Sequence, residues 1–352
     1  MKAALEARFV TVARNWLQLR LSRSSSLRFR SIDCARERQI ISLAMSDGVI
    51  DLHTHTTHSD GSASPEELIA RASSKGARSI AITDHDTVDA FGEARAAADR
   101  FGVEFVPGIE ISADFSPGTM HILGYCIDGE SPVMKEKLAT LKNAREKRNP
   151  EIAGRLEGLG FDISYDEVVQ LAGNKVVGRP HFASVLVKKG YVRNIQEAFD
   201  KLLKKGAPAY VEKARLSPGD SVELIHEAGG VAVLAHPYQL KLSSYEAVDE
   251  LVAELAALGL DGIEAIYSRH SPAQRASYSE IALRHHLLVT GGSDYHGSYK
   301  PDIELVTGLG DLQVSYALLE ALKARAKESQ RRRGIASDRT PESFCSSRRP
   351  GD

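Results

Sequence analysis

The strongest constraint on the fold is an alternation of short apolar runs with helix patterns along most of the chain. Strands that alternate with helices build parallel βα units, and about seven such units predict a closed, distorted TIM-like barrel. The predicted helices begin near Ser64, Asp89, Tyr245 and Pro272. The predicted strands are Val49–Leu52, Ser79–Thr83, Val103–Val106, Ile109–Ile111, His121–Tyr125, Val231–Ala235, Gly262–Ile266 and Leu287–Thr290.

The alternation is interrupted between residues 127 and 216, where the pattern is helical and strongly charged. A new helix start at Ser217-Pro218 marks the return of the strand and helix pattern. We therefore expect an inserted helical lid at 127–216 and a barrel made of 47–126 and 217–312. Residues 313–352 are expected to form a terminal helix and a disordered tail, because they become rich in Arg, Ser, Pro and Gly from Gln330.

The N-terminal segment, residues 1–46, differs from the rest in composition. Its first 44 residues carry nine Lys or Arg against three acidic residues, although the whole chain has a net charge of −2. A basic, Ser-rich, acid-poor segment is typical of an organellar transit peptide. The alternatives are a disordered basic arm or a true start at Met45, and we favour these two.

Composition excludes several classes of protein. The near-neutral charge excludes a globally basic nucleic-acid coat protein. Three scattered cysteines do not form a disulfide framework or a Cys-based zinc site, which favours a reducing compartment. No apolar run approaches the roughly 18 residues that span a membrane, so we expect a cytoplasmic protein.

Histidines and carboxylates gather where predicted strands end, with the exception of His121, which opens its strand. Because the strand ends of a TIM-like barrel meet at its catalytic face, these side chains are expected to meet there. In His53-Thr54-His55 the alternation of a strand turns both imidazoles to one side. Imidazole and carboxylate together suit Zn²⁺, Mn²⁺ or Fe²⁺. The candidate ligands are His53, His55, Asp60, His85, Glu110, His121, His236, Asp294 and His296.

This set of motifs resembles the PHP (polymerase and histidinol phosphatase) family of metal-dependent phosphoesterases, over roughly Val49 to Leu312. Within that family the chain is similar to the bacterial 3′,5′-nucleoside bisphosphate phosphatases, which are related to a 5′→3′ exonuclease on short RNA. The subfamily resemblance depends on His121–Tyr125, Arg145-x-x-Arg148, Gly178–His181 and Tyr267–Ser271. The resemblance implies the PHP type of barrel with its lid.

The resemblance also implies two to three divalent metal ions, with manganese favoured and zinc or iron as alternatives. By motif, His53, His55, Glu110 and Asp294 would hold the first ion. Glu110 would bridge to a second ion completed by His121 and His236. Asp60, His85 and His296 would hold the third.

The chemistry expected at such a cluster is attack on a phosphate ester by a metal-bridged hydroxide. His236, His296 and Asp294 are the expected catalytic residues, with one of the two histidines as donor to the leaving oxygen. Arginine forks match phosphate geometry, and Arg145 and Arg148 lie three residues apart on one helix face. The expected substrate-binding residues are Arg145, Arg148, Arg179, His181 and His270.

We therefore predict a hydrolase that removes the 3′-phosphate of nucleoside 3′,5′-bisphosphates, such as the adenosine compound, to give the 5′-monophosphate. The expected partner is this small nucleotide, with short RNA as an alternative and without a membrane or an obligate protein partner. A 5′→3′ exonuclease at the same site is the alternative activity. From other classes, the alternatives are a non-catalytic PHP accessory module and a nucleic-acid-binding protein that acts through the basic arm.

Overall fold

The computed structural model describes residues 48–173, 177–212 and 214–334. The predicted N-terminal extension and the tail after residue 334 lie outside these residues. The division of the chain at residues 127, 217 and 313 stays a prediction. Among the described helices, none is both long and apolar enough to cross a membrane.

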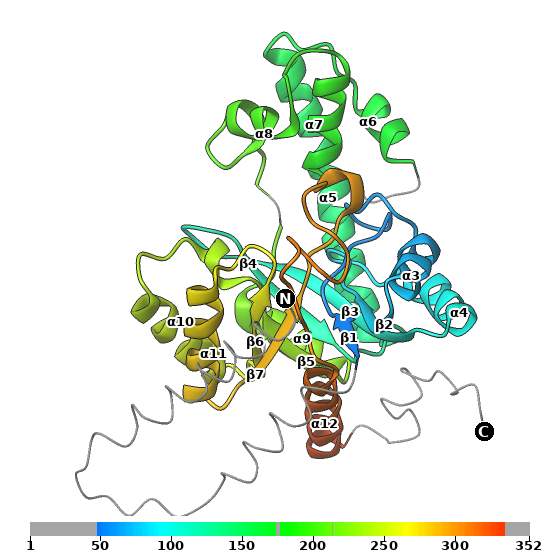
Figure 1. The fold of residues 1–352 in the computed structure, drawn as a ribbon. Coiled ribbons are helices and arrows are strands. Elements are labelled where there is room, and N and C mark those ends of the chain that lie inside the picture. The colour runs from blue at the N-terminus through cyan, green and yellow to red at the C-terminus, as the bar shows by residue number, and fades with distance from the viewer. Residues whose placement is uncertain (1–47, 174–176, 213, 335–352) are drawn as a thin grey trace, which may run out of the picture. The chain divides into compact units, whose positions relative to one another are not determined.

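The centre of the fold is a seven-stranded sheet whose strands follow one another in chain order, β1 to β7. A bridge between Thr54 and Tyr295, beyond the ends of the edge strands β1 and β7, nearly closes the sheet into the TIM-like barrel that the sequence predicts. Figure 1 shows the arrangement of the strands. The strands are β1 (Val49–Asp51), β2 (Ala77–Ile82), β3 (Glu104–Ala113), β4 (Met120–Tyr125), β5 (Val231–Leu234), β6 (Gly262–Tyr267) and β7 (Leu288–Gly292).

The expectation of an all-parallel sheet is wrong for one strand. β4 runs antiparallel to both β3 and β5, whereas the other neighbouring strands are parallel. Only residues 114–119 connect β3 to β4, and a parallel pair needs a crossover of about a dozen residues or more. The runs 103–106 and 109–111 also join into the single strand β3, because Pro107 and Gly108 continue the pairing with β2 and β4.

The barrel closes just beyond the ends of β1 and β7. The backbone N–H of His55 donates to the carbonyl of Tyr295 (2.9 Å), and that of Asp294 donates to the carbonyl of His53 (2.8 Å). Gly292 makes this approach feasible, because a Cβ at that position would lie only 2.3 Å from the Cβ of His53. The closure therefore brings two predicted ligand segments, 53–55 and 294–296, side by side.

Helices cover the outside of the barrel, and serine caps start several of them. Ser64 and Glu67 form a complete capping box at α3, and the Ser217 side chain caps α9 as the sequence predicts. Short 3₁₀ helices, η2 (Pro237–Leu240) and η3 (Gly297–Tyr299), follow β5 and β7. The covering helices are α3 (Pro65–Ser74), α4 (Phe91–Phe101), α9 (Pro218–Glu227), α10 (Tyr245–Ala257), α11 (Pro272–Arg284) and α12 (Tyr316–Arg333).

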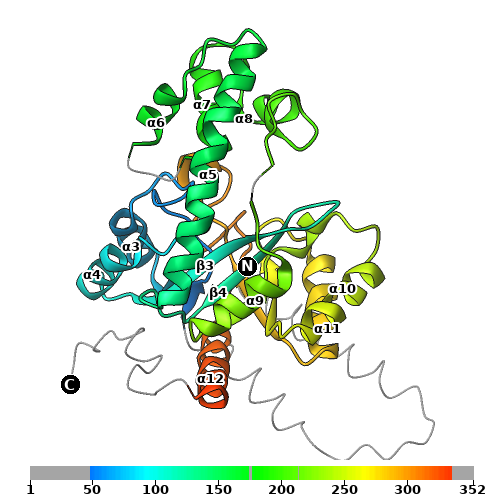
Figure 2. The same ribbon diagram turned by 180° about the vertical axis from the view of Figure 1, so that it is seen from behind.

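The long helix α5 (Pro132–Gly158) belongs to two hydrophobic clusters. Near its start, Met134 and Leu138 pack with residues of β3, β4 and α9. Near its end, Ile152 and Leu156 pack into a separate cluster with the helices that follow (Figure 2). These are α6 (Tyr165–Ala172), α7 (Arg179–Lys188), α8 (Ile195–Ala198) and the π-helical turn η1 (Phe199–Leu203). We call α6 to η1, with the end of α5, the helical lid.

Candidate metal centre

The barrel brings all nine candidate ligands together. Each of them belongs to at least one of four groups in which the ligand atoms lie within 4.8 Å of one another. The loop after β1 supplies His53, His55 and Asp60; His85 follows β2; Glu110 and His121 lie within β3 and β4; His236 follows β5; and Asp294 and His296 follow β7. Their assignment as metal ligands stays a proposal, and the geometry below is what supports it.

Glu110 lies at the middle of the cluster and faces five imidazoles. Its Oε1 lies 2.7 Å from His121 Nδ1 and 2.9 Å from His236 Nε2. Its Oε2 lies 3.2 Å from His55 Nε2, 3.4 Å from His53 Nε2 and 3.1 Å from His85 Nδ1. The two oxygens of Glu110 thus face different sets of histidines, and Glu110 would help to hold divalent cations if these bind.

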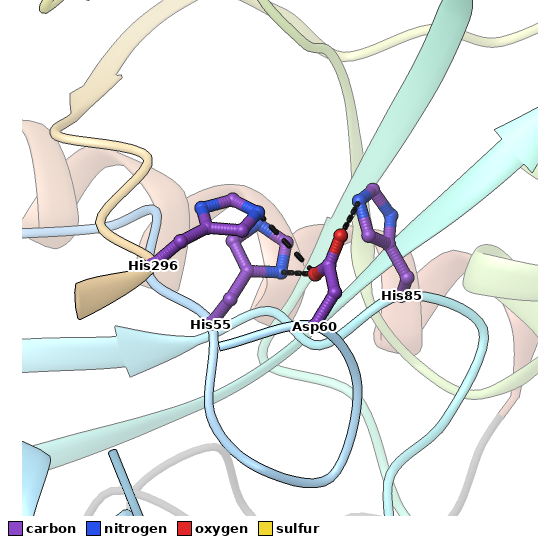
Figure 3. Close-up of side chains that lie close together, drawn as sticks. All are labelled: His55, Asp60, His85 and His296. Carbon is purple, nitrogen blue, oxygen red and sulfur yellow. Dashed lines mark ion pairs between the residues drawn. The ribbon is translucent and has the colours of Figure 1, made fainter. Parts of the chain in front are cut away.

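Asp60 centres a second group, shown in Figure 3. Its carboxylate oxygens lie 3.3 Å from His296 Nε2, 3.7 Å from His55 Nδ1 and 3.8 Å from His85 Nε2. The family resemblance implies Asp60, His85 and His296 for one ion, and the structure adds His55 to that group. His55 thus faces Asp60 with Nδ1 and Glu110 with Nε2.

Several buried ring nitrogens in the cluster have no hydrogen-bond partner among the described residues: His53 Nε2, both nitrogens of His55, His85 Nδ1 and His236 Nδ1. Such atoms are costly to bury unless something binds them. Ligand atoms about 2.1 Å from a common cation lie roughly 3–3.5 Å apart, which matches several of the distances between His and carboxylate atoms. The residues therefore fit divalent cations.

Two candidate ligands also have unusual backbone conformations. His236 has φ of 25° and Asp294 has φ of 58°, a region that non-glycine residues seldom adopt. Strain of this kind persists where the surrounding structure enforces it, and it concentrates at functional sites.

At Glu110 and His53, neighbouring charges outweigh the effect of burial on the pKa. Burial alone would raise the pKa of Glu110, but His121, His85 and His53 hold it well below the usual range. Burial likewise opposes a charge on His53, yet Glu264 and Glu110 raise the pKa of His53 well above its usual value. Without a cation, the Glu110 carboxylate therefore stays anionic and His53 keeps a proton, which a bound divalent ion would displace.

The structure adds a carboxylate that the sequence reasoning missed. Glu264, fully buried in β6, accepts a hydrogen bond from His53 Nδ1 (2.8 Å) and another from the backbone N–H of His236 (2.9 Å). The first bond fixes the His53 tautomer so that Nε2 points to the other ligands. Its position inside the apolar strand run Gly262–Ile266 is the sequence signal that could have identified Glu264.

Asp294 is held by two further donors that were not predicted. Tyr267 Oη and Lys300 Nζ each lie 2.7 Å from its Oδ2. Its Oδ1 faces three imidazoles, at 3.3 Å from His55 Nε2, 3.4 Å from His296 Nδ1 and 3.6 Å from His53 Nε2. The carboxylate is thereby oriented with Oδ1 toward the cluster.

The carboxylate of Asp84, the residue before His85, binds the loop after β1. It accepts hydrogen bonds from the backbone N–H of Thr56 (2.7 Å) and from the hydroxyls of Thr56 (2.6 Å) and Ser59 (2.5 Å). Asp84 therefore shapes the loop that carries Asp60.

A cavity of about 240 Å³ lies between the cluster and the helical lid. Asp60, His85 and His121 line one side of it, and the predicted lid residues Arg148, Arg179 and His181 line the other. We call it the arginine cavity. Arg145 lies in α5, but its side chain is outside what the structure describes. His270 does not line this cavity and is buried among the rings of Tyr238, Tyr267 and Tyr278.

Comparison with known proteins agrees with this geometry. A family model for the PHP domain matches residues 51–258. The chain is 37% identical to a 5′-3′ exoribonuclease of Haemophilus influenzae, over 70% of this chain and 89% of that protein. It is 35% identical to a 3′,5′-nucleoside bisphosphate phosphatase of Chromobacterium violaceum, over 70% of this chain and 87% of that protein.

The fold is also similar to a solved structure from Bifidobacterium adolescentis, described as a metal-dependent phosphoesterase. The two are 32% identical with a TM-score of 0.71, over 78% of this chain and 96% of the other. Family match, sequence relatives and structural similarity converge on one conclusion. The chain belongs to the PHP domain family and is a hydrolase of the phosphoesterase kind.

Proposed function

We propose that the chain removes the 3′-phosphate of nucleoside 3′,5′-bisphosphates and leaves the 5′-monophosphate. The observation that supports this most is the two-sided arginine cavity. A cluster suited to divalent cations lines one side and the lid cations line the other. A substrate with two phosphates can place the scissile phosphate at the cluster and its second phosphate at the lid.

The lid residues have the hydrogen-bond geometry of an anion site. His181 Nδ1 accepts the backbone N–H of Gly178 (3.1 Å), so a neutral imidazole carries its proton on Nε2. Arg148 is buried, and its Nε and Nη2 donate to Asn149 Oδ1, which fixes the plane of the guanidinium. Preorganised arginines of this kind recognise phosphate well.

Arg179 adds a charge that is costly to keep without an anion. Its Nη1 donates to the carbonyl of Leu203 (3.1 Å), and its guanidinium lies 5.3 Å from the Tyr210 ring centre. Burial lowers the pKa of Arg179, because desolvation disfavours the charged form. A phosphate in the cavity would favour the charge again.

The barrel residues supply the cation site and its orientation. Divalent ions bound there would neutralise phosphate oxygens and lower the pKa of a water molecule. Glu110 and Asp60 would each bind these ions together with neighbouring histidines. Tyr267 and Lys300 hold the Asp294 carboxylate in place through hydrogen bonds. Manganese is the metal we expect, with zinc or iron as alternatives, because imidazole and carboxylate ligands suit all three.

Within the catalytic set, the two histidines differ in their contacts. His236 keeps Nδ1 without a hydrogen-bond partner among the described residues, whereas His296 Nδ1 lies 2.9 Å from the backbone carbonyl of Asp294. His236 therefore has a ring nitrogen that can meet a cation or the leaving oxygen. The catalytic roles of His236, His296 and Asp294 remain part of this proposal.

Cleavage of short RNA from its 5′ end is the second candidate activity at this site. The relative named as an exoribonuclease is 37% identical and the one named as a bisphosphate phosphatase is 35% identical, so identity does not separate them. Both reactions break the bond between a 3′ oxygen and phosphorus in a nucleotide with a 5′-phosphate. A non-catalytic module is disfavoured, because the whole set of candidate ligands is present and brought together.

A substrate panel tests the proposal. Purified chain with Mn²⁺ would be incubated with a nucleoside 3′,5′-bisphosphate, the 3′- and 5′-monophosphates, histidinol phosphate and a 5′-phosphorylated short RNA. We expect phosphate release to be fastest from the bisphosphate and to be abolished in His53→Ala and Asp294→Ala variants. Faster cleavage of RNA would favour the exonuclease, and inactivity with bound metal would favour the non-catalytic module.

A further inference from the structure

A second hollow of about 360 Å³ lies beside the metal centre, and three tyrosines line it. Tyr238 comes from η2 after β5, Tyr245 from the start of α10, and Tyr278 from α11. We call it the tyrosine pocket. Because its segments follow the carboxyl ends of β5 and β6, it opens on the barrel face that carries the candidate ligands.

One aromatic ring separates this pocket from the cluster. The ring of Tyr238 lies 5.7 Å from that of Tyr267, and the ring of Tyr267 lies 5.3 Å from that of His236. Tyr267 also donates to Asp294. The cluster and the tyrosine pocket therefore lie on either side of the buried ring of Tyr267.

The rings of the pocket are already held in position. Tyr278 packs against His270 (4.8 Å) and meets Tyr245 edge-on (5.8 Å, 70°), and Tyr238 meets His270 edge-on (5.5 Å, 85°). Tyr278 is buried, whereas Tyr245 is 41% exposed. The pocket thus offers a rigid aromatic wall with one tyrosine open to an incoming ligand, and its volume is that of a small-molecule site.

The tyrosine pocket and the arginine cavity differ in the charge of the residues that line them. None of the described residues that line it is Lys or Arg, and its charged lining residue is Glu246. Hydrogen bonds from its own backbone N–H and from Ser244 lower the pKa of Glu246, so the carboxylate stays anionic. Such a site repels a phosphate but suits a neutral, planar group with N–H donors. Nucleobases have this chemistry, and tyrosines are platforms on which bases stack.

We propose that the tyrosine pocket binds the base of the nucleotide that follows the scissile phosphate in an oligonucleotide. This rests on the proposed function, because the first nucleoside and its 5′-phosphate would occupy the arginine cavity. In a bisphosphate no nucleotide follows, and the pocket stays empty. The pocket therefore serves the second candidate activity, cleavage of short RNA, by binding the second base.

Binding of a 5′-phosphorylated dinucleotide with 2-aminopurine as its second base tests this. The linkage carries a methylene group in place of the 3′ oxygen, so that the chain with bound Mn²⁺ cannot cleave it, and quenching of the 2-aminopurine fluorescence gives the dissociation constant. Removing one stacking tyrosine weakens nucleic-acid binding roughly five- to a hundredfold, so Tyr245→Ala should weaken binding about tenfold. Tyr191→Ala is the matched control, because Tyr191 is a similarly exposed tyrosine (39%) of the helical lid.

A dinucleotide with 2-aminopurine as its first base and an abasic second position completes the design. It should bind more weakly to the unaltered chain, and Tyr245→Ala should cause no further loss. Equal binding of the first probe by the unaltered chain and Tyr245→Ala, or no binding by either, overturns the proposal. Phosphate release from the bisphosphate is measured separately. A chain that binds as predicted but releases no phosphate contradicts the proposed function and supports the pocket.

Discussion

Replacement of Tyr267 by phenylalanine should weaken metal binding without disturbing the fold. Burial and Asp294 raise the pKa of Tyr267 well above its usual value, so the phenol is a neutral donor to Asp294 Oδ2 at 2.7 Å. A hydrogen bond to a charged group contributes about 1.5–3 kcal/mol. Lys300 still holds the same oxygen in the variant, so we expect the low end, which corresponds to about a tenfold loss of affinity.

Tyr267 is a cleaner probe of this arrangement than Lys300. Removal of Lys300 would also remove a positive charge that repels the bound cation, and the two effects oppose each other. Tyr267→Phe changes the number of donors to Asp294 and leaves the net charge unchanged. Its effect on affinity therefore reports the orientation of the carboxylate alone.

The assay is calorimetric titration of the metal-free chain with Mn²⁺. Tyr125→Phe is the matched control, because Tyr125 is also fully buried and its hydroxyl makes no hydrogen bond to a candidate ligand. We expect Tyr267→Phe to bind Mn²⁺ about tenfold more weakly and Tyr125→Phe to bind it as the unaltered chain does. Equal affinity in the two variants would refute the role given to Tyr267.

Three further predictions concern Arg148, Glu264 and His270. Arg148→Gln should lower kcat/KM for the bisphosphate by about 10- to 100-fold but should change kcat/KM for a 3′-monophosphate little. The control Arg193→Gln, on the exposed lid surface, should leave kcat/KM for both substrates unchanged. Glu264→Gln should weaken Mn²⁺ binding by about 10- to 100-fold, because the hydrogen bond that fixes the His53 tautomer is altered; an unchanged affinity would contradict this. Burial lowers the pKa of His270 from 6.5 to about 4, so the unfolded state takes up the proton first as the pH falls. The free energy of unfolding of the metal-free chain should then fall by about 2 kcal/mol more between pH 7 and 5 than in His270→Asn, and parallel pH profiles in urea unfolding would count against it.

The sequence predicts the barrel strands well because each is a local pattern of apolar residues bounded by turns. The direction of β4 was missed, although the short connection from Ala113 to Met120 already excludes a parallel crossover. Most candidate ligands were predicted for a related reason: chain order alone places strand ends on one face of a barrel. Glu110 and His121 lie within β3 and β4 instead.

Other parts of the site depend on contacts between distant segments. The hydrogen bond from Tyr267 to Asp294 joins two strand ends, and nothing near Tyr267 in the sequence marks it as a donor to a ligand. The burial of His270 away from the arginine cavity depends on rings from three different segments. Glu264 is different, since a carboxylate within an apolar strand run is a local feature of the amino-acid sequence.

The most direct test of the account is to identify the product that the chain forms from a nucleoside 3′,5′-bisphosphate. The reaction with Mn²⁺ would be followed by ³¹P NMR, with a metal-free reaction and the His55→Ala variant as controls. We expect loss of the 3′-phosphate signal, accumulation of the 5′-monophosphate, and no reaction in either control. Release of the 5′-phosphate, or release that continues without metal, would contradict the placement of the scissile phosphate at the histidine cluster.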